Sequence, residues 1–347
     1  MSKISQQPFG KTREGKSVDQ FTITNRNGLE AKLTNYGATI VGLRTPDKNG
    51  ELSEITLGFD SIDGYLGDHP FYGCIAGRYA NRIRAGEFVL AGAHHKLALN
   101  DHGNHLHGGN LGFNRKIWEP TIVGQSVVFS LLSPDGDEGY PGNLSVHVAY
   151  ALTDQNSLSL HYRVTTDART VHNLTNHTYF NLDGSATILD HDMMLNADRF
   201  TPTDAGLIPT GEIASVEGTP LDFRQSTRIG NRIRSDYEAL NFAGGYDHNW
   251  IINGATSELN LAARASSRVS GRVLECYTDQ PAIQFYAGNM IAPGTLSRSK
   301  IIGRNAGFCL ETQHYPDSPN IPNFPSTVLD PGDVFQSTTV YRFSVSN

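Results

Sequence analysis

The sequence predicts an all-β protein, a sandwich or barrel of many strands with few and short helices. Three observations lead to this prediction. Apolar residues recur at every second position, turn signals follow one another at short spacing, and no long stretch has a 3.6-residue apolar period. The 35 glycines support many turns. A short helix is expected only in places such as Tyr237–Phe242.

Four stretches carry the two-residue period most clearly. In "LSVHVAYAL" (144–152) and "LSLHYRV" (158–164) every second residue is apolar, and 127–132 and 338–345 follow a similar pattern. Successive side chains of a strand point to opposite faces, so this alternation predicts strands with one buried face. Turn chemistry separates the strands, at Asp47-Lys-Asn-Gly, Asp135-Gly-Asp-Glu-Gly, Tyr140-Pro-Gly-Asn and Asp330-Pro-Gly-Asp.

A single globular domain covering residues 1–347 is expected, although the length alone fits one large domain or two ordinary ones. The 347 residues can bury a sizeable core, and 38% hydrophobic with 18% charged residues give no sign of disorder. No linker, composition shift or fixed-period repeat divides the chain. The net charge of −7 favours neither nucleic acid nor an anionic membrane as a partner.

The expected location is the cytoplasm. The first 17 residues contain no apolar segment of a secretory signal, and no run of 18 apolar residues predicts a transmembrane helix. The three cysteines, Cys74, Cys276 and Cys309, are odd in number and far apart, which indicates reduced thiols.

Residues 315–333, "YPDSPNIPNFPSTVLDPGD", contain five prolines. Proline lacks a backbone N–H and fixes φ, so this segment cannot be a helix or a central strand. It is expected to form a stiff surface loop, either a rigid crossover or a wall of a binding site.

Metal binding is not expected. His105 and His107 would share one face of a strand, and with His102 they resemble a ligand cluster. However, no carboxylate follows at usable spacing, because the next acid is Glu119, and no H-E-x-x-H is present. His105 is expected to be a surface or loop residue.

Other catalytic motifs are missing from the sequence. It has no G-x-S-x-G, no P-loop and no G-x-G-x-x-G. The remaining possibility is proton transfer by histidine and carboxylate side chains. The amide and aromatic side chains in the same segments would suit a sugar ligand, because they can contact its hydroxyl groups and its C–H surface.

The stretch "NLTNHTYFNL" (173–182) places a histidine inside a predicted strand. Its odd positions, including His177, are polar, whereas Leu174, Phe180 and Leu182 are apolar. The pattern alone leaves open whether His177 is functional or structural.

Motifs that are individually weak follow one another along essentially the whole chain: "TNYGATI" (34–40), "LGFD" (57–60), "GRYANRI" (77–83), "LHGG" (106–109), "DGDEGYPG" (135–142), "NLTNHTYFNL", "ADRFTPTD" (197–204), "IPTGEI" (208–213), "GTPLDF" (218–223), "YDHNW" (246–250), "QFYAGN" (284–289) and "LETQHYPDSPN" (310–320). In this order, the motifs resemble those of the aldose 1-epimerase (galactose mutarotase) family. The likeness thins only at 291–304, where the family is usually shorter.

The resemblance implies a large antiparallel β-sandwich and an enzyme that interconverts the α and β anomers of free aldoses without a cofactor. It also implies Glu311 as the general base, His177 as the general acid and His107 as a second histidine near the ring oxygen and C1. The implied substrate-binding residues are Asn81, Arg82, Tyr179, Asp247 and Gln284.

These residue types fit the chemistry of ring opening. A carboxylate removes the proton of O1 while an imidazolium protonates O5, and each well-placed acid or base contributes about 10²–10⁴-fold. With an unperturbed pKa near 6.5, His177 would donate around neutral pH, and a nearby Glu311 carboxylate would favour its charged form.

Three alternatives stay open. In the first, the substrate is a hexose 6-phosphate, whose phosphate could be bound by Arg78, Arg82 and Arg84. In the second, the chain binds carbohydrate but does not catalyse a reaction. A two-carboxylate glycosidase or lyase would need Asp247 as its second acid. The expected partner is a small sugar, and the chain could be a monomer or a homodimer.

Overall fold

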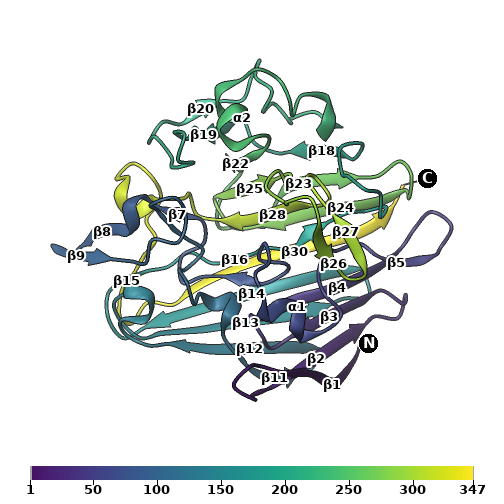
Figure 1. The fold of residues 1–347 in the computed structure, drawn as a ribbon, viewed down its shortest axis with the longest axis horizontal. Helices are drawn as coiled ribbons and strands as arrows, with labels where there is room; N and C mark the ends of the chain where they lie inside the picture. Colours follow the sequence, from purple (N-terminus) through teal and green to yellow (C-terminus); the bar gives the residue numbers. More distant parts are fainter. Residues whose placement is uncertain (1, 347) are drawn as a thin grey trace.

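The computed structural model describes residues 2–346, and nearly all of its regular structure is antiparallel strand (Figure 1). A five-stranded sheet has the order β1 (Lys3–Lys11), β2 (Ser17–Thr24), β3 (Glu30–Thr34), β4 (Thr39–Pro46) and β5 (Leu52–Glu54). A nine-stranded sheet has the order β11 (Glu119–Val123), β12 (Ser126–Ser133), β13 (Leu144–Leu152), β14 (Ser157–Thr166), β30 (Phe335–Val345), β24 (Arg272–Thr278), β23 (Asn260–Ser266), β18 (Asp192–Leu195) and β21 (Thr227–Arg228). A six-stranded sheet has the order β17 (Tyr179–Phe180), β28 (Phe308–Gln313), β25 (Ala282–Tyr286), β22 (Asp247–Ile251), β19 (Arg199–Thr201) and β20 (Ala214–Ser215).

Short pairs of strands and single turns of helix connect these sheets. The two-stranded ladders are β7 (Arg82–Ile83) with β10 (His105–Leu106), β6 (Ile75–Ala76) with β16 (Thr175–Asn176), β8 (Glu87–Leu90) with β9 (Ala93–Lys96), β15 (Thr170–Val171) with β29 (Val328–Leu329), and β26 (Thr295–Ser297) with β27 (Lys300–Ile302). The α-helices are α1 (Ile62–Leu66) and α2 (Glu238–Ala243), and the 3₁₀ turns are Arg84–Gly86, Phe113–Arg115, Asp137–Gly139, Ile229–Asn231 and Ser318–Asn320. Within residues 2–346, neither α-helix is long enough to cross a bilayer.

One hydrophobic core joins the three large sheets. Phe21 of β2 packs edge-on against Phe129 of β12, with ring centroids 5.7 Å apart. On the other side, the Tyr341 hydroxyl of β30 donates to the Leu310 carbonyl of β28 at 3.1 Å. The C-terminal strand β30, yellow in Figure 1, lies between β14 and β24. Its backbone pairs with both neighbours and thereby connects the two halves of the nine-stranded sheet.

The predicted strands are confirmed. The stretch 144–152 is β13, with alternating buried and half-buried residues, and the other three stretches fall within β14, β12 and β30. The short helix predicted near 237–242 is α2. Alternation succeeded here because each of these strands buries one face against the common core.

The proline-rich segment is only partly the surface loop that was predicted. It stays outside the large sheets, yet Tyr315, Asp317 and Phe324 are buried. The rings of Tyr315 and Phe324 meet edge to face at 5.1 Å and pack with Ala282 of β25. The segment therefore covers one end of the six-stranded sheet.

The stretch 173–182 is not one strand, which corrects the sequence prediction. Thr175–Asn176 pairs with β6, whereas Tyr179–Phe180 pairs with β28. His177 lies where the chain changes partner, and its N–H donates to the Cys74 carbonyl at 2.9 Å. Strand periodicity could not reveal this change, because both halves are buried on both faces.

Candidate active site

Strand β28 gives the site its carboxylate. Alternate residues of a strand face opposite sides, so Leu310 packs in the core while Cys309 and Glu311 face away from it. Gln284 of β25 lies directly opposite Glu311 in the register. On the next strand, Asp247 of β22 lies opposite Tyr286 of β25. The six-stranded sheet thus gathers polar groups on the face away from the core.

These groups border a pocket of about 160 Å³. This volume is below the roughly 300–1,000 Å³ typical of drug-sized ligands, so the pocket suits a single small molecule. Its lining residues are Pro70, Phe71, Asn81, Arg82, Leu106, His107, His177, Tyr179, Asp247, Tyr286, Met290 and Glu311.

Every residue predicted for the site lies at this pocket except Gln284, which is one step behind it. The Gln284 amide donates to Oδ1 of Asp247 at 2.7 Å. It therefore orients the Asp247 carboxylate, and the structure gives it no direct place in the pocket wall.

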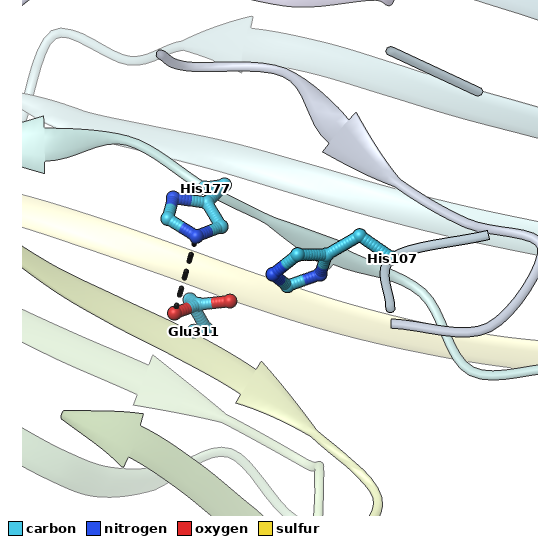
Figure 2. Close-up of side chains that lie close together, drawn as sticks. All are labelled: His107, His177 and Glu311. Atoms are coloured by element: carbon cyan, nitrogen blue, oxygen red, sulfur yellow. Dashed lines mark ion pairs between the residues drawn. The ribbon is translucent and has the colours of Figure 1, made fainter. Parts of the chain in front are cut away.

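His177 and Glu311 form the centre of the site. Nε2 of His177 is 3.7 Å from Oε1 of Glu311, with both side chains almost fully buried (Figure 2). This separation is too long for a hydrogen bond. Oε2 of Glu311 has no hydrogen-bond partner among the described residues. Both groups can therefore accept contacts from a ligand.

Burial shifts both groups toward their neutral forms. It lowers the pKa of His177 to about 4. It raises the pKa of Glu311 well above its usual value, with the nearby Asp247 carboxylate adding to this effect. The expectation of an unperturbed His177 was therefore wrong, because full burial of the imidazole outweighs the hydrogen bond to backbone that favours its charged form.

Each shift favours the neutral form of its group, and the neutral pair still contains one proton that can be transferred. Neutral His177 with protonated Glu311 and imidazolium with carboxylate contain the same number of protons. The two forms differ only in where that proton lies, so the pair titrates as a unit.

His107 is the second histidine of the site. The N–H of Asn81 points at its Nδ1 at a distance of 3.2 Å. A backbone N–H can only donate, so Nδ1 holds a lone pair and the ring proton is on Nε2. Burial, followed by the effect of His177, lowers the pKa of His107 well below 6.5. His107 is thus a neutral hydrogen-bond donor.

The same tautomer bears on metal binding. Among the described residues, ligand atoms of His107, His177 and Glu311 lie within 4.8 Å of one another. A metal on Nε2 of His107 would require the ring proton on Nδ1, directly against the Asn81 N–H. The present arrangement therefore does not fit a metal ion.

His105 is not the surface or loop residue that was predicted. It is fully buried, its Nδ1–H donates to the Ala98 carbonyl at 2.8 Å, and its Nε2 accepts from the Tyr140 hydroxyl at 2.6 Å. It also does not share a strand face with His107, because β10 ends at Leu106 and His107 has φ of 49°.

Arg82 brings a positive charge to the pocket. Its Nε is 2.7 Å from Oδ2 of Asp101, and both side chains are largely buried. Arg82 opposes the rise that burial causes in the pKa of Asp247. The pair of Asp101 and Arg82 therefore keeps an oriented cation next to an oriented carboxylate.

The three nearby arginines do not converge on one ligand. The guanidinium of Arg78 is buried and donates to the carbonyls of Ser133, Pro134, Pro141 and Gly142. Arg84 is half exposed and pairs with Asp204 and Asp317. Only Arg82 lines the pocket.

Sequence reasoning missed part of the apolar wall. The Phe71 ring lies 4.7 Å from the His107 ring and 5.8 Å from the His177 ring. Phe71, Asn81 and His107 all have left-handed φ, at 58°, 64° and 49°. Such conformations cost energy and cluster at functional sites. The local residue pattern does not predict these left-handed conformations. The proline, aromatic and glycine residues around Phe71 indicate only a turn.

Comparisons with known proteins identify the family of this chain. The family model described as aldose 1-epimerase matches residues 19–342. The chain is 43% identical to bovine galactose mutarotase and 41% identical to the human protein, over the full length of both chains in each case. It is 37% identical to the aldose 1-epimerase of Escherichia coli K12, covering 95% of this chain and 96% of that protein. The crystal structure of galactose 1-epimerase from Lactobacillus acidophilus superposes with a TM-score of 0.88 at 32% identity, with complete coverage of both chains. The chain therefore belongs to the aldose 1-epimerase family of isomerases.

Proposed function

We propose that this chain interconverts the α and β anomers of free aldohexoses such as galactose and glucose. The observation that carries the proposal is the buried pair of Glu311 and His177, 3.7 Å apart on the wall of a small pocket. An acid and a base that face one cavity can act on two oxygens of one sugar ring.

In this proposal Glu311 takes the proton of O1–H while Nε2 of His177 gives its proton to O5. The C1–O5 bond breaks, and C1 and O1 become an aldehyde. Rotation about C1–C2 presents the other face of the aldehyde to O5. The ring then closes as His177 takes back the O5 proton and Glu311 returns its proton to O1.

The remaining residues bind and orient the sugar. His107, fixed with its proton on Nε2, donates a hydrogen bond near C1 and the ring oxygen. Asp247, oriented by Gln284, and Arg82, oriented by Asp101, bind hydroxyl groups, together with Asn81 and Tyr179. The ring of Phe71 covers an apolar face of the sugar.

Polarimetry of freshly dissolved α-galactose, α-glucose and glucose 6-phosphate tests this function. We expect rapid conversion of the free sugars and slower conversion of the phosphate, because Arg78 and Arg84 are engaged elsewhere. Preference for the phosphate would favour the phosphosugar alternative. Sugar binding without conversion would favour a carbohydrate-binding protein.

The proposal also includes a single domain over residues 1–347, a small sugar as the partner and a cytoplasmic location. The chain is proposed to act without a cofactor, as a monomer or a homodimer. Sedimentation of the purified protein distinguishes these two assemblies.

A further inference from the structure

A thiol lies behind the His177 ring. Cys309 and Glu311 are two residues apart on β28, so both side chains point to the same face. Sγ of Cys309 is 3.5 Å from Nδ1 of His177, and Oε1 of Glu311 is 3.7 Å from Nε2. The imidazole therefore lies along β28 with one ring nitrogen toward each of these two side chains.

A thiol differs from the usual partners of a catalytic imidazole. A carboxylate or carbonyl only accepts, and a backbone N–H only donates, so each fixes one tautomer. The S–H group donates weakly, the sulfur accepts weakly, and the hydrogen rotates about the Cβ–Sγ bond. The sulfur of Cys309 can therefore accept a hydrogen bond from Nδ1–H of His177.

The thiol keeps its own proton. Cys309 is fully buried. Burial, assisted by the nearby Glu311 and Asp247 carboxylates, raises the pKa of Cys309 well above its ordinary value. The group behind His177 is thus a neutral thiol and not a thiolate, which would hold the imidazolium as a tight ion pair.

We propose that Cys309 is a positioning residue for proton transfer, whose sulfur accepts a hydrogen bond from Nδ1–H of His177 and so leaves Nε2 of the ring to exchange its proton with the sugar. This inference rests on the proposed role of His177 as the acid. Nδ1–H donates to Sγ while the ring carries two protons, and also after Nε2 has given its proton to O5. No proton passes between sulfur and nitrogen.

Other groups also influence the titration of His177. Titratable or charged groups of the pocket and of the elements packed against the ring include Glu311, His107, His69, Tyr179, Tyr286, Cys74, Cys309, Arg82 and Asp247. The test therefore compares whole pH profiles of variants that differ only at one thiol.

The experiment compares Cys309→Ala with Cys309→Ser and with the control Cys276→Ala. Cys276 is as completely buried on a strand as Cys309, but it lies on β24 of the nine-stranded sheet, whereas the thiol of Cys309 lies at His177. We expect Cys309→Ala to lower kcat on α-galactose by about tenfold, the scale of one lost hydrogen bond, with little change in KM. Cys309→Ser should restore most of the rate. Its hydroxyl is a better acceptor for Nδ1–H, so the acid limb of kcat/KM should move to higher pH.

Cys276→Ala should leave kcat and both pH limbs unchanged. The inference is overturned if Cys309→Ala has the same kcat and pH profile as Cys276→Ala. It is also overturned if Cys309→Ala loses rate but Cys309→Ser neither restores it nor moves a limb, because the thiol then only fills space. Full activity of His177→Asn would instead contradict the role of His177 in the proposed function.

Discussion

The two pocket histidines differ in what lies behind each ring. His107 and His177 are both buried, and their ring centroids are 5.1 Å apart. Nδ1 of His107 faces the N–H of Asn81, whereas Nδ1 of His177 faces the Cys309 thiol. Only His177 can take a second proton without opposing a fixed donor. The atom behind the ring, and not burial, distinguishes the proposed acid from the neutral donor.

Local backbone structure creates this difference. His107 follows the end of β10 with left-handed φ and pairs with Asn81, which is also left-handed. Each residue's N–H then reaches the other, that of His107 to a carbonyl and that of Asn81 to a ring nitrogen. His177 lies between β16 and β17, where its ring reaches along β28 instead.

The largest effect is expected for Glu311→Gln. Glutamine keeps the shape of the side chain but cannot accept the O1 proton, so kcat should fall by at least about 10²-fold while sugar still binds. Polarimetry measures kcat of the variant, and a binding titration measures its affinity for the sugar. A rate near that of the parent would remove Glu311 from the role of base.

Thermal stability provides the folding control for this variant. An unfolded glutamate ionises near pH 4.3, whereas burial raises the pKa of Glu311 in the native state. The native state therefore loses stability as the pH rises between these two values. At neutral pH, Glu311→Gln should have a Tm equal to or above that of the parent.

The second test compares His177→Asn with His107→Asn. Asparagine can donate a hydrogen bond but cannot protonate O5. We therefore expect His177→Asn to lower the rate of conversion by about 10²-fold or more. His107→Asn should lower this rate by a smaller factor. Both rates are measured on α-galactose, together with the Tm of each variant.

The opposite order of the two rates would exchange the proposed roles of the histidines. A lowered Tm of His177→Asn with an unchanged rate per folded molecule would make His177 a structural residue.

The pH profile should reflect the pair of His177 and Glu311. The active form carries one transferable proton, so kcat/KM should rise as a doubly protonated pair loses one proton and fall as the pair loses the other. Burial lowers the pKa of His177 to about 4 and raises that of Glu311. The acid limb should therefore lie below the ordinary histidine value of about 6.5.

His107→Asn should keep both limbs, because the pKa of His107 lies well below its ordinary value. An acid limb that disappears in His107→Asn would show that His107 titrates during the reaction.

The smallest effect is expected for metal removal. The tautomer of His107 opposes a metal on the three central side chains, so exhaustive treatment with EDTA should leave the rate unchanged. Loss of activity that one divalent metal restores would contradict both the tautomer and the acid–base mechanism.

The sequence by itself determined the fold class and most of the site. Alternation predicted β12, β13, β14 and β30, because each strand has one face in the common core. The ordered motifs named Glu311, His177, His107, Asp247, Arg82, Asn81 and Tyr179, and the fold brings them to one pocket. Residue identity carries this information because the required acids, bases and amides are chemically distinct.

Only the tertiary structure decided how these residues behave. The burial that shifts the pKa of His177, the N–H behind His107 and the thiol behind His177 all come from contacts between distant parts of the chain. Likewise, only the structure shows that His105 is buried and that Gln284 lies behind Asp247, to which it donates a hydrogen bond. A local pattern records which groups are present, but pKa and tautomer depend on the solvent and hydrogen-bond partners that folding leaves around each group.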